Sequence, residues 1–307
     1  MDLSIQQLRM LREVSELGTI AAAAEALGYT PSAVSQQLAS IERTTGVEVL
    51  ERVGRNVQLT DAGRELVIHA DIVLGELERA QASLERVKGD IAGTVRVGLS
   101  ESMASRFLPP LLQMAARRHP ELIIRTEEFP SESSGVEAVR SGRLDACFVM
   151  AASHAPIQDG IIFEPLFRDW FRIVVQEDSD WGHGRNEMAL NELADAPFVL
   201  APFRVWCGRL IHGACQDAGF SPNVVHEIDD YPATLNVVAA GAGVSLVPEL
   251  GLAHQPGGLR VLDISTPFCR TVELAYRQSS ATRPAISALV NLAGDIARDL
   301  GLDVIEG

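Results

Sequence analysis

Residues 19–61 read TIAAAAEALGYTPSAVSQQLASIERTTGVEVLERVGRNVQLTD and combine an alanine-rich helix, a short turn, a polar-faced helix and a loop that carries arginines. Gly28 can end the first helix, and Thr30 can cap a second helix that has Pro31 at its first position. A connection this tight between two helices predicts a helix-turn-helix, the motif that places its second helix in the major groove of DNA.

The second helix, over residues 30–45, has two faces of different chemistry. Val34, Leu38 and Ile41 follow helical spacing and are expected to face inward. The opposite face carries small or hydrogen-bonding side chains suited to reading base edges, namely Ser32, Gln36, Ala39 and Arg43. The Gly and Asn within residues 53–57 indicate a tight turn and hence a short two-stranded wing. The alternative is a small helical bundle with a hairpin and no nucleic-acid partner.

The formal net charge of −15 argues against DNA, because proteins that grip phosphates are usually basic where they do so. Residues 1–60 alone hold five arginines against seven acidic residues. Arg43, Arg52 and Arg55 nevertheless cluster at the end of the second helix and in the loop after it, where the motif would place phosphate. The chain has one lysine, Lys88, and arginine suits phosphate and guanine better than a point charge does. The local pattern therefore favours DNA although the global charge does not.

Residues 8–63 resemble the winged helix-turn-helix of LysR-type transcriptional regulators. The resemblance runs through LRMLR at 8–12, AAEAL at 23–27, SAVSQQL at 32–38, IE at 41–42, GV at 46–47, LER at 50–52 and LTDAG at 59–63. It implies groove-facing residues at Pro31, Ser32, Ser35 and Gln36, and a wing arginine at Arg55. Pro31 stands where the family often has Gln, and Gln36 where it often has Arg, which implies base reading through glutamine and serine. The predicted DNA-binding residues are Thr30, Pro31, Ser32, Ser35, Gln36, Arg43, Arg52 and Arg55.

Residues 61–88 contain no proline and carry an apolar seam in regular steps of four and three. The seam residues are Leu66, Ala70, Val73, Leu77, Ala80, Leu84 and Val87. Three heptads of this kind predict a helix that pairs with a partner helix. Ile68, Ile72 and Leu74 lie outside the seam, so the helix is also expected to touch its own winged unit. An amphipathic helix packed only within its own chain is the alternative, and the resemblance favours the linker helix that pairs two subunits.

After residue 93 the pattern alternates between strands and helices. Strands are expected over 94–99, 122–127, 144–150, 171–176, 244–248 and 271–276, and helices over 107–118, 135–141, 235–242 and 284–300. This alternation predicts an α/β domain with a mostly parallel sheet covered on both faces. The resemblance implies the two-lobed, periplasmic-binding-protein-like sensor of the family. The expected organisation is a DNA-binding domain over 1–60, a dimerisation helix over 61–90, a first lobe over 91–166 and 268–307, and a second lobe over 167–267.

Two lobes create a cleft in which strand ends and helix N-termini face a ligand. The resemblance implies that an effector is held by Ser102 and by residues 131–133 of the first lobe, opposite residues 205–207 of the second. The predicted effector-binding residues are Ser100, Ser102, Ser131, Glu132, Ser133, Val205, Trp206 and Cys207. Serines at helix N-termini favour an anionic ligand, whereas Glu101 and Glu132 favour a cation, so the charge of the effector stays open. Serine loops of this kind are also simply good helix caps.

Four cysteines, at 147, 207, 215 and 269, lack CxxC spacing and fit a reducing compartment. Cys215 stands at the place of a redox cysteine in the family's peroxide sensors, and Cys207 is one position away from the other. On a continuous helix, however, their spacing gives a rise of about 12 Å, beyond the reach of a disulfide. Buried, inert thiols are the favoured interpretation, with a redox-sensing regulator as the alternative.

No catalytic or metal-ligating constellation is visible, so neither an enzyme nor a cofactor is expected. The seven histidines are scattered, and Gly241-Ala-Gly243 lacks the third glycine of a dinucleotide fingerprint. No run approaches the roughly 20 apolar residues of a membrane span, and no leader pattern opens the chain, which predicts a cytoplasmic protein.

The predicted function is that of a LysR-type regulator. Its partners would be double-stranded DNA at an interrupted palindrome, a small-molecule effector, and further copies of the chain in a homodimer or dimer of dimers. The alternative from another class is a small-molecule receptor of periplasmic-binding-protein type with an accessory helical domain.

Overall fold

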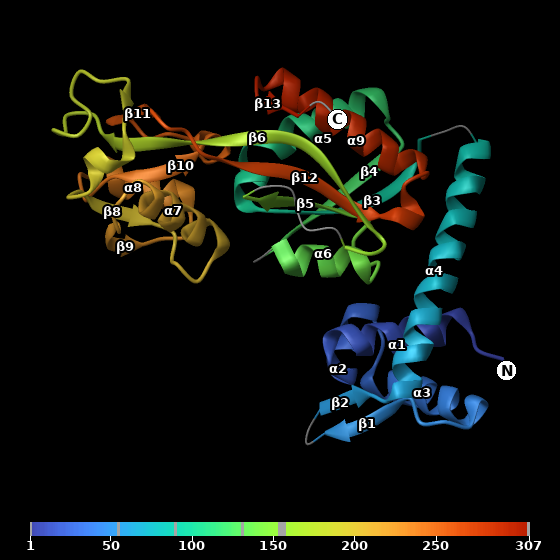
Figure 1. The fold of residues 1–307 in the computed structure, drawn as a ribbon. Helices are drawn as coiled ribbons and strands as arrows, with labels where there is room; N and C mark the ends of the chain where they lie inside the picture. The colour runs from blue at the N-terminus through green and yellow to red at the C-terminus, as the bar shows by residue number, and fades with distance from the viewer. Residues whose placement is uncertain (1, 54–55, 89–90, 130–131, 153–157, 306–307) are drawn as a thin grey trace.

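The structure is a computed structural model that describes residues 2–53, 56–88, 91–129, 132–152 and 158–305 (Figure 1). The N-terminal unit consists of three helices and a hairpin: α1 (Ile5–Leu17), α2 (Ile20–Leu27), α3 (Pro31–Thr45), β1 (Leu50–Val53) and β2 (Asn56–Leu59). The hairpin strands are antiparallel, with Val53 opposite Asn56, and they form the predicted wing.

Local capping chemistry sets the turn between α2 and α3. The Thr30 side-chain oxygen accepts from the Ala33 amide at 3.2 Å, and Pro31 holds the first helical position. Gly28 and Gly46 end α2 and α3 with φ of 72° and 74°, in the left-handed region that favours glycine. Val34, Leu38 and Ile41 are buried against the alanines of α2, so the predicted helix-turn-helix and its inner face are confirmed.

The long helix α4 (Asp61–Lys88) leaves the wing and runs past the N-terminal unit to the C-terminal domain (Figure 1). Leu66 and Val67 pack on the core of the N-terminal unit, and α4 lies against α1. Further along, α4 contacts η4 (Gln278–Ser280) and α9 (Pro284–Asp299).

The C-terminal domain has two lobes. Lobe 1 is built from β3 (Gly93–Leu99), η1 (Met103–Phe107), α5 (Leu108–Arg118), β4 (Leu122–Glu128), α6 (Glu132–Arg140), β5 (Ala146–Ala151), β12 (Cys269–Arg277), η4, α9 and β13 (Asp303–Val304). Its strand order is β4-β3-β5-β12-β6, and helices α5 and α9 pack together on its main core. Lobe 2 contains β7 (Glu187–Met188), η2 (Leu190–Leu193), β8 (Pro197–Leu200), α7 (Trp206–Asp217), β9 (Asn223–Glu227), α8 (Tyr231–Ala239), β10 (Ser245–Pro248), η3 (Glu249–Leu252) and β11 (Leu259–Ile264).

The strand β6 (Ile161–Gln176) spans both lobes (Figure 1). Its first part pairs with β12 as far as Trp170, and from Phe171 onward it pairs with β10 and β11. The strand expected at 171–176 therefore starts ten residues earlier. All of these pairings are antiparallel, whereas β3 is parallel to β4 and β5, so the expectation of a mostly parallel sheet is wrong and the sheet is mixed. The reason is that the chain passes from lobe 1 to lobe 2 through β6 and returns before β12. These two neighbouring strands therefore run in opposite directions.

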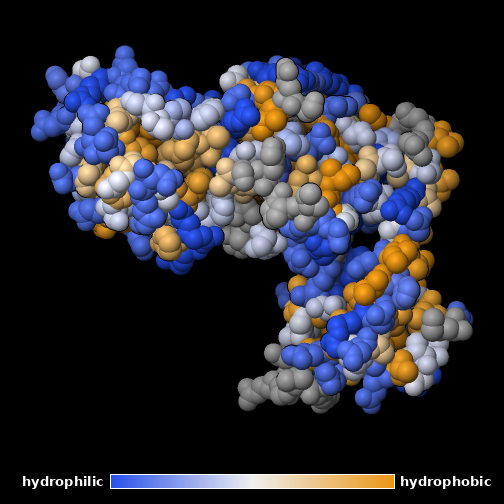
Figure 2. All heavy atoms as spheres, in the orientation of Figure 1, coloured by the Kyte–Doolittle hydropathy of each residue, from blue (hydrophilic) through white to orange (hydrophobic). Residues whose placement is uncertain are grey.

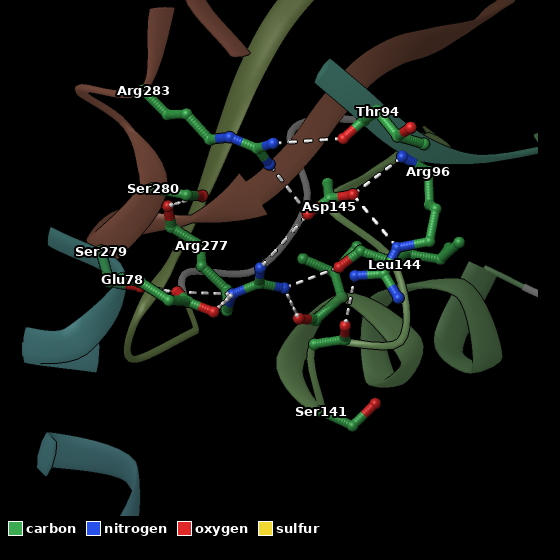
Figure 3. Close-up of polar contacts among 12 residues, drawn as sticks. Glu78, Thr94, Arg96, Ser141, Leu144, Asp145, Arg277, Ser279, Ser280 and Arg283 are labelled. Atoms are coloured by element: carbon green, nitrogen blue, oxygen red, sulfur yellow. Dashed lines mark hydrogen bonds and ion pairs between the residues drawn. The ribbon is translucent and has the colours of Figure 1, made fainter. Parts of the chain in front are cut away.

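A cluster of charged residues fastens α4 to lobe 1 (Figure 3). Arg277 donates through Nε to both carboxylate oxygens of Glu78, at 3.0 and 2.9 Å. Arg283 donates to Glu85 and to Asp145, each at 3.1 Å. Asp145 is buried and also accepts from the backbone amide of Arg96 at 2.8 Å. These bonds tie the orientation of α4 to lobe 1.

Among the described helices, none combines the length and the apolar composition that crossing a bilayer requires.

Candidate functional site

The outer face of α3 is exposed and polar. Thr30, Pro31, Ser32, Ser35, Gln36 and Arg43 are all exposed. The Thr30 and Ser32 hydroxyls lie 3.0 Å apart at the start of the helix. Since the apolar side of α3 is buried, this face is free to enter a groove and present hydrogen-bonding groups to base edges.

The other two predicted DNA-binding arginines are Arg52 and Arg55. Arg52 pairs through its backbone with Val57 in the hairpin, and Arg55 lies outside the described residues. Arg12, in contrast, is 9% exposed, and its guanidinium donates to the Ser141 carbonyl of lobe 1. Arg12 therefore faces the C-terminal domain rather than DNA.

The seam of α4 is divided between the chain's own contacts and solvent. Ala70 is buried, and Leu66 packs on the N-terminal core. Val73, Leu84 and Val87 are 45%, 65% and 85% exposed, and Figure 2 shows apolar side chains at the surface along this helix. Glu78 and Glu85, which bind Arg277 and Arg283 of lobe 1, occupy a different face of α4, so the outer part of the seam stays exposed.

A cavity of about 740 Å³ lies between the lobes. Six of the predicted effector-binding residues line it: Ser100, Ser102, Ser133, Val205, Trp206 and Cys207. Ser131 lies outside the described residues, and Glu132 is described only as the first residue of α6. The structure thus brings residues from both predicted sides of the cleft to one cavity.

The sequence reasoning missed a buried ion pair, of which one member, Arg270, lines this cavity. Arg270 of β12 and Asp169 of β6 are opposite each other in the strand register, are 3% and 0% exposed, and lie 2.8 Å apart. Arg270 also donates to the Ser102 hydroxyl at 2.8 Å, and Ser100 lies 3.2 Å from Ser102. Because the Ser102 side chain makes no capping bond, its role differs from that of a simple helix cap. Its oxygen accepts from Arg270, which leaves its own proton to donate to Ser100 or to a ligand.

The opposite charge is also present at the cavity. Glu101 lines it, and burial, together with the carboxylates of Asp230 and Glu128, raises the pKa of Glu101. Glu128, Arg204, Arg209 and Asp229 also line the cavity. Met150, Phe163 and Trp206 supply apolar and aromatic wall.

One signal in the sequence could have found the ion pair. Asp169 alternates with Phe167 and Phe171, which are both fully buried, so strand periodicity places its carboxylate in the core, where it needs a partner. Arg270 has no comparable local signal, because its position depends on pairing across 101 residues.

The thiols of α7 lie in surroundings that suppress thiolate formation. Cys215 is fully buried, and burial raises its pKa to about 12. Burial also raises the pKa of Cys207, whose sulfur lies 3.2 Å from the Tyr231 hydroxyl. Both cysteines lie on one continuous helix, and reactive cysteines usually have a lowered pKa, so this geometry disfavours a disulfide switch between them.

Comparison with known proteins agrees with both parts of the molecule. Residues 5–64 match the family described as "Bacterial regulatory helix-turn-helix protein, lysR family", and residues 88–298 match "LysR substrate binding domain".

Two curated relatives extend the match along the chain. The uncharacterized HTH-type transcriptional regulator YfeR of Shigella flexneri is 30% identical over 316 residues, covering 100% of this chain and 97% of its own length. The transcriptional dual regulator GltC of Bacillus subtilis is 29% identical, covering 82% of this chain and 83% of its own.

Solved structures share the fold. A full-length OxyR variant from Pseudomonas aeruginosa has a TM-score of 0.74 at 22% identity, covering 100% of this chain and 99% of that one. Full-length BenM has a TM-score of 0.61 at 23% identity, covering 99% and 100%. The helix-turn-helix, the two-lobed sensor and the two family matches together lead to one conclusion: the chain belongs to the LysR family of DNA-binding transcriptional regulators.

Proposed function

We propose that this regulator binds an interrupted palindromic operator through α3 and the wing, and that the cavity between its lobes binds a small organic molecule with an acidic group. The observation that supports the effector assignment most strongly is the hydrogen bond from Arg270 to Ser102, two residues that both line the cavity. The protein acts where its target DNA is, in the cytoplasm, and it regulates without catalysing a reaction.

Sequence reading on DNA is assigned mainly to Gln36. Its side chain is exposed on the polar face of α3, and a glutamine amide can form two hydrogen bonds with adenine. Selecting specific duplexes from a randomised pool with the full-length protein, and then measuring binding by Gln36→Ala, tests this assignment.

Gln36→Ala is expected to weaken binding to the selected duplex by roughly 5- to 150-fold, corresponding to about 1–3 kcal/mol for one bidentate contact. Binding to an unrelated duplex should change little. Thr44→Ala, an exposed position on the same helix outside the predicted set, is the matched control. Equal binding of the selected duplex by Gln36→Ala and wild type would exclude Gln36 from base reading.

The effector is proposed to carry an acidic group and an apolar skeleton. The Ser102 hydroxyl is polarised by Arg270 and would donate to an anionic acceptor, while Met150, Phe163 and Trp206 would contact the carbon skeleton. A thermal-shift screen of small carboxylic acids, matched amines and neutral analogues tests the charge of the ligand.

An acid that raises the melting temperature of the wild type should bind Ser102→Ala roughly 10- to 100-fold more weakly, as expected for loss of a bond to a charged group. Ser221→Ala, at an exposed position outside the cavity, should bind like wild type. Stabilisation by amines alone, or an unchanged response of Ser102→Ala, would overturn the assignment.

The open part of the α4 seam is proposed to pair two chains, and two such pairs form the dimer of dimers. Val73, Leu84 and Val87 support this assignment because they expose apolar surface on one side of the helix. Pairing would place two copies of α3 on one operator and raise affinity by multivalency.

A further inference from the structure

Helix α6 connects the cavity to the DNA-binding unit. Ser133, near its N-terminal end, and Val136, at its middle, line the cavity. At its other end, the Val139 carbonyl accepts from Arg277, and the Ser141 carbonyl just beyond the helix accepts from Arg12. The helix has nine residues and is about 13 Å long, so one rigid element reaches from the cavity to both contacts.

The two arginines come from different parts of the molecule. Arg12 belongs to α1 of the DNA-binding unit, and Arg277 holds Glu78 of the linker helix (Figure 3). Arg277 also donates to the Leu144 carbonyl at 2.6 Å. The turn after α6, over residues 141–145, therefore joins lobe 1 to both the DNA-binding unit and the linker helix.

The turn has little space for a side chain at the position closest to Arg12. Gly142 has φ of +78°, and a Cβ there would lie 3.3 Å from the Arg12 Nη2 atom. Both the backbone conformation and the close approach of Arg12 favour glycine at this position.

The helix is also packed closely on the sheet below it. A Cβ on Gly135 of α6 would lie 2.4 Å from the Cys147 sulfur on β5, and Val139 is fully buried. Because the interface has no slack, a ligand that displaces the N-terminal end of α6 would move its C-terminal end as well.

Two buried polar atoms of α1, close to lobe 1, have no hydrogen-bond partner. Among the described residues, the buried side-chain nitrogen and oxygen atoms that lack a hydrogen-bond partner are Arg12 Nε and Glu16 Oε2, and both belong to α1. An unmet buried donor or acceptor weakens the arrangement that buries it. The contact between α1 and lobe 1 is therefore suited to being made and broken.

We infer that α6 transmits occupancy of the cavity to the DNA-binding unit by moving the Ser141 carbonyl relative to Arg12, so that α1 docks on lobe 1 or is released from it. This inference rests on the proposed effector site, since it assigns a regulatory role to the wall of that cavity. Arg12 acts here as a positioning residue and does not touch DNA or effector.

The docking contact can be measured without effector or DNA. Spin labels are attached through an unnatural amino acid at the exposed positions Ala26 of α2 and Arg117 of α5, and the labelled chain is co-expressed with excess unlabelled chain. Arg12→Gln is expected to broaden the narrow distance distribution of the wild type. Arg9→Gln, at an exposed position on the same helix, should leave it unchanged. An unchanged distribution in folded Arg12→Gln would overturn the docking contact.

The coupling through α6 is tested by displacing the helix from the sheet. Gly135→Ala places a methyl group against Cys147 and should shift or broaden the same distribution, although Arg12 is intact. Gly213→Ala on α7, where a Cβ meets nothing within 4 Å, is the control. The double variant Gly135→Ala/Cys147→Ala removes the clash and should restore the wild-type distribution.

The outcomes separate the relay from the proposed function. A wild-type distribution in folded Gly135→Ala, or failure of the double variant to restore it when both proteins are folded, would overturn the relay. Binding of the selected duplex and the thermal-shift response test the regulator itself. Either proposal can therefore fail while the other stands.

Discussion

At the scale of single residues, Glu16 lies near charged side chains of three helices at the boundary of the two domains. Arg12 and Glu13 flank it on α1, Asp71 approaches from α4, and Glu137 from α6. Burial, opposed by Arg12 and reinforced by the three carboxylates, raises the pKa of Glu16 to about 8. The Glu16 side chain is therefore protonated at neutral pH when the domains are docked.

This proton makes docking pH-dependent. A carboxyl whose pKa is raised in the docked state stabilises that state fully below its ordinary value of 4.5, and the stabilisation is lost as pH rises to about 8. The melting temperature should therefore fall between pH 6 and pH 8.5, and Glu16→Gln, which cannot ionise, should show a smaller fall. Burial also raises the pKa of Glu13 and Asp71, so some pH dependence remains. Glu25→Gln, on an exposed part of α2, serves as the control, and equal pH profiles for wild type and Glu16→Gln would contradict the prediction.

At the scale of secondary-structure elements, α4 has two working faces. One face carries Glu78 and Glu85, which bind arginines of lobe 1, and the other exposes Val73, Leu84 and Val87. A helix with both faces used within its chain would bury both, so the exposed face fits a partner helix.

Leu84→Glu should therefore weaken self-association. Burying a carboxylate in a helix pair is costly, and in a symmetric pair the substitution places two charges in the same interface. Sedimentation velocity over a range of protein concentrations is expected to show an increased monomer fraction, with at least tenfold weaker pairing. Ser83→Glu adds the same charge at the neighbouring exposed position and should associate like wild type. If both variants associate equally, the seam is not the pairing surface.

The sequence predicts an element well when neighbouring residues determine its structure, and poorly when distant residues do. Gly28, Thr30 and Pro31 act through their own backbone and caps, and the turn that they predict is present in the structure. The first part of β6 was missed because Pro165 interrupts the strand pattern and the register shifts at a bulge beside it. Pairing with β12, more than 100 residues away, holds that stretch in the sheet.

The site shows the same distinction. The serine loops and residues 205–207 could be placed at a cleft from the family pattern, and Ser100, Ser102, Ser133 and residues 205–207 line the cavity. Arg270 could not, because nothing near it in the sequence indicates a buried partner. Arg12 was counted among the cations of the DNA-binding unit, because a count of charges does not show which way each side chain points. In the structure its guanidinium binds the Ser141 carbonyl of lobe 1.

At the scale of the whole molecule, the net charge of −15 limits how the protein can bind DNA. Three arginines per chain, Arg43, Arg52 and Arg55, are assigned to phosphate. Because the net charge is negative, we expect no general attraction between the remaining surface and the duplex, so each subunit should bind weakly by itself.

The salt dependence of binding should therefore be shallow. Three phosphate contacts give a slope of log affinity against log salt of roughly −3 per subunit. Titrating the selected duplex between low and moderate salt by fluorescence anisotropy measures this slope. Arg43→Gln should reduce its magnitude by about one unit, and a much steeper wild-type slope would reveal phosphate contacts from cations outside the three.

The sheet order has a consequence for synthesis on the ribosome. Strand β12 lies between β5 and β6, yet about 100 residues separate the part of β6 that it pairs with from β12 itself. At a synthesis rate of roughly 5–20 residues per second, the nascent chain exposes the edge of β5 for about 5–20 s. The DNA-binding unit and lobe 2 are continuous segments that can fold before β12 is synthesised, so we expect lobe 1 to be the last part to complete its sheet.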